Sequence, residues 1–123
     1  MSRKQGLWAI SGLFTLYLST QWLRAQTQHR IVEVATLKLA DGVSREQFQK
    51  VDQEMEATYM EKRSGFLSRE SAPGKDGTWV AIVHWRSLAD ADASMKSFSS
   101  APGTAQWMSE IAPHSLVMNR YGW

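Results

Sequence analysis

The chain has 123 residues, of which 43% are hydrophobic and 21% are charged, and these proportions are typical of a single folded domain. It contains no cysteine, which excludes a disulfide scaffold, a thiol nucleophile and a cysteine-ligated metal centre. The formal net charge is +2, and no run of lysine and arginine is longer than two residues, so the sequence does not indicate a nucleic-acid interface.

The first 25 residues have the layout of a secretory signal peptide. Arg3 and Lys4 give a positive start, Leu7–Ser19 is uncharged and mostly apolar, and Ala25 supplies the small residue at the predicted cut. As a helix this run of 13 residues would rise roughly 20 Å, which is short against a hydrocarbon core of about 30 Å. We therefore predict a cleaved signal peptide over residues 1–25 and a periplasmic or secreted protein, with an uncleaved membrane anchor as the alternative.

Cleavage of the signal peptide would change the net charge of the protein. Three of the 14 basic residues and none of the 12 acidic residues precede the predicted cut, which leaves 11 basic against 12 acidic residues. The remaining segment, Gln26–Trp123, is therefore almost neutral. We predict that it forms one domain without a nucleic-acid partner, and that it meets a membrane only through the leader, if the leader is uncleaved.

The domain is predicted to begin with a strand and a helix. Ile31–Leu39 is rich in β-branched and aliphatic residues over the length of a strand, with apolar residues on both faces. Ser44, followed three residues later by Gln47, is a capping box that starts a helix predicted over Arg45–Arg63. The apolar stripe of this helix consists of Phe48, Val51, Met55 and Tyr59.

A hairpin follows the first helix. Phe66–Ala72 and Thr78–Arg86 are predicted strands on either side of Pro73–Gly77, whose Asp-Gly pair favours a tight reversal. Residues of the second of these strands alternate between two faces that are both largely apolar. One face carries Trp79, Ala81, Val83 and Trp85, and the other carries Val80, Ile82 and His84.

A second helix is predicted after the hairpin. Ser87 with Asp90 forms its capping sequence, and the helix ends near Ser99. A short helix over Thr104–Ile111 and a last strand over His114–Tyr121 complete the chain.

The order βαββαβ predicts an α+β fold of the ferredoxin-like type, a four-stranded antiparallel sheet with its helices on one face. The other face would still carry aliphatic and aromatic residues, and the domain is too short to fold another layer over it. We therefore predict a homodimer formed through this sheet face, because a twofold axis places the same apolar patch on both sides of an interface.

Two segments, Ser64–Arg69 and Ile82–Ala91, resemble the antibiotic biosynthesis monooxygenase family of dimeric α+β barrels. In that family a Gly-Phe pair opens the second strand, and a tryptophan that ends a strand is followed by a serine-capped helix. The resemblance covers Ile31–Tyr121 and implies a homodimer with a small-molecule pocket between the sheet and the helices of each subunit. It also implies a cofactor-independent oxygenase, a haem-degrading enzyme or a protein without established activity, since the family holds all three.

The sequence departs from the haem-degrading members. Those members use an asparagine on the first strand, a tryptophan in the second helix and a histidine after it, where this chain has Thr36, Met95 and Gln106. No metal-ligand motif is present. We therefore predict neither a cofactor nor a metal.

His84 is the predicted catalytic residue. A neutral imidazole in the middle of an apolar strand could accept a proton or hold a phenolate near neutral pH. The alternative is a half-buried core or interface histidine with one hydrogen bond.

Four further residues are predicted to bind a small apolar or aromatic ligand. Arg69 could pair with an anionic or enolate group, and Trp107 could act as a lid over the pocket. Asn119 and Tyr121 share a strand face and offer an amide and a phenol to a ligand oxygen. The alternatives are an exposed arginine, a packing tryptophan and a sheet face with satisfied polar groups.

Two functions are compatible with the sequence. The first is a cofactor-independent monooxygenase that acts on an aromatic or polycyclic phenol or quinol in an apolar pocket. The second is a small-molecule binding or stress-associated module of the same fold, without catalysis.

Overall fold

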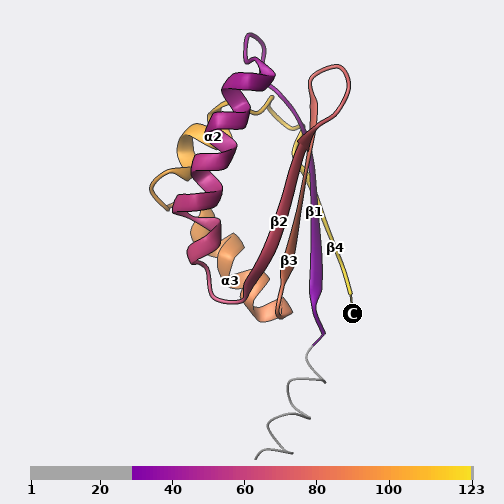
Figure 1. Cartoon of the computed structure of the whole chain (residues 1–123), viewed down its shortest axis with the longest axis vertical. Coiled ribbons are helices and arrows are strands. Elements are labelled where there is room, and N and C mark those ends of the chain that lie inside the picture. The colour runs from indigo at the N-terminus through magenta and orange to yellow at the C-terminus, as the bar shows by residue number, and fades with distance from the viewer. Residues whose placement is uncertain (1–28, 123) are drawn as a thin grey trace, which may run out of the picture.

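The computed structural model describes residues 29–122 (Figure 1). The predicted signal peptide over residues 1–25 lies outside them. None of the helices in residues 29–122 combines the length and the apolar character needed to cross a membrane. The elements, in chain order, are β1 (Ile31–Lys38), α2 (Arg45–Thr58), the 3-10 helix η1 (Met60–Lys62), β2 (Phe66–Pro73), β3 (Thr78–Trp85), α3 (Leu88–Phe98), α4 (Thr104–Ser109) and β4 (Val117–Tyr121).

The four strands form one antiparallel sheet in the order β2-β3-β1-β4. β1 and β3 therefore lie at the centre, and each βαβ half leaves room for a strand of the other half. The helices lie on one side of the sheet, and among the described residues the other side carries no covering element (Figure 1). The predicted α+β ferredoxin-like fold is confirmed.

Alternation along the central strands separates a helix-covered face from an open face. On β1 the exposed fraction is 1% for Ile31 and 3% for Leu37, both beneath the helices, whereas Thr36 between them is exposed. β3 repeats this pattern, because the four residues that alternation groups on one face, Trp79, Ala81, Val83 and Trp85, are all buried. The core of the domain lies between this face and the helices, and its largest fully buried side chains are Trp85, Tyr59, Phe48 and Ile31.

α2 starts where the capping box predicts. The Ser44 hydroxyl oxygen accepts a hydrogen bond from the backbone N–H of Gln47 at 3.1 Å. The predicted end at Arg63 is wrong, because α2 stops at Thr58 and the chain tightens into η1. Tyr59 lies at this junction and packs under α3, where its hydroxyl donates to the Ser94 carbonyl oxygen at 2.7 Å.

Gly65 joins η1 to β2 and sits against the start of α3. Its φ is +77°, and a Cβ at this position would overlap the carboxylate of Asp90. That carboxylate accepts a hydrogen bond from the Ser87 hydroxyl at 2.8 Å, and the Ser87 oxygen accepts from the Asp90 N–H at 3.2 Å. The glycine therefore allows the predicted cap of α3 to pack directly against the first hairpin strand.

The last two elements are shorter than predicted. α4 ends at Ser109 rather than Ile111, and β4 begins at Val117 rather than His114. His114 has a φ of +65°, which an extended strand does not allow. It lies in a turn closed by the Ser115 N–H donating to the Ala112 carbonyl oxygen at 3.2 Å.

Candidate functional site

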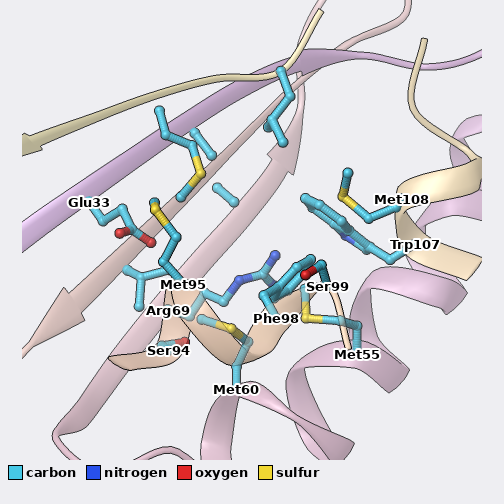
Figure 2. A pocket seen from close by; sticks show the side chains of 15 residues that line it. Glu33, Met55, Met60, Arg69, Ser94, Met95, Phe98, Ser99, Trp107 and Met108 are labelled. Atoms are coloured by element: carbon cyan, nitrogen blue, oxygen red, sulfur yellow. The ribbon is translucent and has the colours of Figure 1, made fainter. Parts of the chain in front are cut away.

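A cavity lies between the sheet and the three helices α2, α3 and α4 (Figure 2). Its volume is about 180 Å³. The sheet contributes the small residues Ala35 and Ala81 from the two central strands, and the helices contribute mainly sulfur-containing and aromatic side chains. The full lining is Glu33, Ala35, Met55, Met60, Arg69, Ala81, Val83, Ser94, Met95, Phe98, Ser99, Trp107, Met108, Leu116 and Met118.

Methionines line both the buried interior and the solvent-exposed rim of this cavity. Met55 and Met60 are buried, whereas Met95, Met108 and Met118 are 48%, 44% and 40% exposed. The three exposed thioethers come from α3, α4 and β4, and the cavity therefore meets solvent between these elements. Unbranched methionine side chains adapt easily to the shape of a ligand.

An ion pair is buried at the α2 side of the cavity. Arg69 Nη2 donates to Asp52 Oδ1 at 2.7 Å and Nη1 donates to Asp52 Oδ2 at 2.9 Å, and the two side chains are only 2% and 5% exposed. Nη1 also donates to Glu56 Oε1 at 3.2 Å. Trp107 Nε1 donates to Asp52 Oδ1 at 2.9 Å, which links α4 to the same carboxylate.

These contacts decide the protonation of Asp52. Burial by itself would raise the pKa of this carboxyl, but the hydrogen bonds and charge of Arg69, with the Trp107 N–H, hold the pKa below its usual value. Burial would likewise lower the pKa of Arg69, and the two carboxylates raise it instead. Both partners therefore remain charged at neutral pH.

A second ion pair lies at the β4 side. Arg120 Nε donates to Glu33 Oε2 at 2.8 Å, and Nη1 also pairs with Asp92 on α3. The Glu33 side chain is 7% exposed, whereas that of Asp92 is 52% exposed. Although burial would lower the pKa of Arg120, the two carboxylates raise it. The pair closes the space between the edge strand β4 and α3.

The structure brings Arg69 and Trp107 together at the cavity and places the other predicted site residues elsewhere. His84 pairs in register with Val32, which also pairs with Tyr121, so these side chains form a row on the open face of the sheet. Asn119 lies on the same face, opposite Val34. His84, Asn119 and Tyr121 therefore do not line the cavity, and their proposed roles require a ligand on the open face.

A β-bulge explains why Arg69 faces inward. Phe66 pairs with Trp85 and Arg69 pairs with Val83, so three steps along β2 match two steps along β3. The extra residue lies between Phe66 and Ser68 and reverses the alternation after it. Without the bulge, Ser68 and Glu70 would face the helices and Arg69 would face the open side.

Sequence reasoning missed Glu33 and Asp52. Glu33 is in phase with Ile31, Ala35 and Leu37, so simple alternation would have placed it on the buried face of β1. Asp52 follows Phe48 by four residues and lies on the edge of the apolar stripe of α2. Each is a charged residue at a buried position, and such residues are paired or functional.

The possible metal ligands in the described part of the chain differ in their positions relative to the cavity. No group of three or more histidine, cysteine, aspartate or glutamate side chains comes together among residues 29–122. None of the histidines in this range lines the cavity.

The fold is shared with solved oxygenase structures, although no protein-family model matches the chain and no curated protein matches its sequence. SnoaB, a cofactor-independent oxygenase from Streptomyces nogalater, superimposes with a TM-score of 0.62 at 12% identity, over 76% of this chain and 91% of SnoaB. A candidate antibiotic biosynthesis monooxygenase from Caulobacter crescentus gives 0.62 at 20% identity, over 78% and 91% of the two chains.

The same fold also occurs in a conserved protein from Methanosarcina mazei, with a TM-score of 0.57 at 15% identity over 78% of this chain and 94% of the other. The TM-scores show a common fold, and at identities of 12–20% they show the fold alone. The predicted resemblance to the antibiotic biosynthesis monooxygenases is thus confirmed in the fold.

Proposed function

We propose that the protein is an exported homodimer and a cofactor-independent monooxygenase that oxidises an aromatic phenol or quinol in the cavity between its sheet and its helices. The observation that carries the proposal is the apolar, methionine-lined cavity with an aromatic wall, on the fold of a known cofactor-independent oxygenase. Aromatic and apolar linings with a few placed polar groups are typical of small-molecule sites.

In such chemistry the substrate is its own reductant. When a ring C–H of a phenol reacts with dioxygen to give a quinone, one oxygen atom becomes the new carbonyl and the other leaves as water. The ring hydrogen and the hydroxyl hydrogen of the phenol enter that water, so atoms and electrons balance without a cofactor. The protein would hold the substrate, exclude bulk water and position it for dioxygen.

The size of the cavity bears on the substrate. Ligand pockets commonly enclose about 300–1,000 Å³, whereas this cavity encloses about 180 Å³. A compound of one or two rings therefore fits the described conformation more readily than a polycyclic one. A larger substrate would have to displace the methionines of the rim.

The homodimer is supported by the open face of the sheet. Val32 and Val34 on β1, and Val80 and Ile82 on β3, are only partly buried within one subunit. An apolar face in the middle of a sheet is stabilised when a second copy covers it. Export rests on the layout of residues 1–25.

Oxygen uptake tests the proposed reaction. A panel of anthrones, quinols and naphthols would be incubated with the protein in an oxygen-electrode cell. Ala81 lines the cavity and is 3% exposed, so Ala81→Leu should occupy part of the cavity and strongly lower uptake. Ala57→Leu, at an exposed position of α2, is the matched control. If Ala81→Leu and Ala57→Leu took up oxygen at the same rate, the reaction would not take place in the cavity.

The same assay decides the role predicted for His84. If the reaction takes place in the cavity, His84→Ala should retain uptake, because His84 lies on the open face. A loss of oxygen uptake in His84→Ala, with unchanged melting temperature and oligomeric state, would indicate that the reaction takes place on the open face.

The alternative is a binding or stress-associated module without catalysis. It is favoured by the fact that the predicted base, His84, does not line the cavity, while the charged side chains near the cavity are already paired. A ligand that raises the melting temperature and is recovered chemically unchanged would support this function over the oxygenase.

A further inference from the structure

The two arginines next to the cavity are both neutralised by carboxylates. Arg69 contacts Asp52 and Glu56, and Arg120 contacts Glu33 and Asp92. In each cluster one carboxylate is deeply buried and holds its arginine at 2.7–2.8 Å. The second carboxylate is more exposed, so solvent screens it, but its charge is negative as well. Neither cluster has positive charge left over.

Because the carboxylates neutralise both arginines, the ion pairs determine which ligand charge the cavity can bind. Arg69 is the single cationic side chain among the lining residues, and its two Nη atoms already donate to Asp52 and Glu56. An anion that leaves water for an apolar cavity needs an uncompensated partner, because its desolvation is costly. The lining residues provide none, because their other polar side chains are Glu33, Ser94 and Ser99.

Glu33 presents a free acceptor to the cavity. Its Oε2 accepts from Arg120, whereas its Oε1 accepts no hydrogen bond from residues 29–122. The side chain is more than nine-tenths buried and belongs to the lining. Figure 2 shows its carboxylate directed toward the same space as Met95 and Arg69. A ligand donor that reaches Oε1 would form a hydrogen bond to a charged group.

We infer that the cavity selects a neutral aromatic compound whose hydroxyl group donates to Glu33, and that it rejects the corresponding anion. The inference rests on the proposed function and specifies the form in which the substrate binds. It replaces the expectation that Arg69 pairs with an anionic or enolate group, since Arg69 instead anchors α2 to β2 through Asp52.

Three naphthalenes of similar size test this selectivity at pH 7 by calorimetric titration of the full-length protein. 2-Naphthol is neutral and carries the donor, 2-methoxynaphthalene lacks the donor, and naphthalene-2-sulfonate carries a negative charge. We expect 2-naphthol to bind at least about tenfold more tightly than either of the others, as the loss of a hydrogen bond to a charged group predicts.

Two variants assign the selectivity to Glu33. Glu33→Gln should weaken 2-naphthol binding by about tenfold and bring naphthalene-2-sulfonate closer to it. Glu61→Gln removes the same charge from an exposed position of η1. It should change neither the affinity for 2-naphthol nor the ratio of that affinity to the affinity for naphthalene-2-sulfonate. If Glu33→Gln fails to fold, the comparison of the three compounds on the unsubstituted protein still decides the matter.

The outcomes separate this inference from the proposed reaction. Equal affinities for 2-naphthol and naphthalene-2-sulfonate, equal affinities for 2-naphthol and 2-methoxynaphthalene, or no binding of any of the three would overturn it. Selective binding of 2-naphthol without oxygen uptake by any substrate would support it while contradicting the oxygenase. Oxygen uptake without selective binding of 2-naphthol would support the oxygenase and contradict this inference.

Discussion

Asp52 and Arg69 face each other across the interior as a two-point ion pair, with N···O distances of 2.7 and 2.9 Å. One residue lies on α2 and the other on β2, and both side chains are almost completely removed from solvent. The pair therefore fixes how the longest helix lies over the edge of the sheet. It also holds Trp107 of α4 in the wall of the cavity.

We expect Asp52→Asn to lower the free energy of unfolding by about 3–5 kcal/mol, because it leaves the Arg69 guanidinium buried with only the partly exposed Glu56. Urea unfolding followed by tryptophan fluorescence measures the change. Glu54→Gln, on the exposed side of the same helix, should alter the free energy by less than about 0.5 kcal/mol. A similar cost for both variants would contradict a structural role of the pair.

The stability should also depend on acid pH through Asp52. The pKa of this group is lowered on folding, so its contribution is complete above the pKa of the unfolded chain, about 3.9, and is lost as the pH falls through the lower folded value. The gap in unfolding free energy between the protein and Asp52→Asn should therefore narrow as the pH falls below about 4. Unfolding curves at a series of pH values measure it, and a constant gap would contradict the lowered pKa.

A comparison of Trp107 with Trp85 separates the contribution of the hydrogen bond to Asp52 from the effect of a smaller aromatic ring. Both indoles are buried, but Trp107 Nε1 donates to Asp52 whereas Trp85 Nε1 has no partner in the described part of the chain. Each Trp→Phe change removes the same part of the ring. We expect Trp107→Phe to cost about 1.5–3 kcal/mol more than Trp85→Phe. Thermal unfolding gives the comparison, and the reverse order would refute the assignment.

The proposed homodimer makes a prediction for the open face. Ile82 lies at the centre of that face, opposite Val34 on the neighbouring strand. Ile82→Glu would bury a charge in the interface, and we expect the protein to sediment as a monomer at micromolar concentration. Gln53→Glu, on the exposed side of α2, should leave the dimer intact. If the unsubstituted protein already sedimented as a monomer, that result would contradict the proposed homodimer.

Much of the fold follows from short-range patterns. Capping pairs at Ser44 and Ser87 start helices where the sequence predicts, because a cap depends on residues three positions apart. Alternation groups the four buried residues of β3 on one face, but it does not say which face lies beneath the helices. The errors lie at the ends of elements such as η1 and the turn at His114, where tertiary packing and a positive φ override the local pattern.

The site depended on contacts that no local pattern contains. A bulge in β2 decided that Arg69 faces inward, and a hydrogen-bonded register with β3 is needed to see it. The sequence could offer His84, Asn119 and Tyr121 as polar strand residues, but only the assembled sheet separates their face from the cavity.

The sequence by itself determined the kinds of element, their order and therefore the ferredoxin-like sheet, because periodicity and capping act over a few residues. Only the tertiary structure decided which charges meet: Asp52 with Arg69, and Glu33 with Arg120, across 17 and 87 residues. Such pairings depend on how a helix or an edge strand packs on the sheet. The local sequence around each residue does not contain that information.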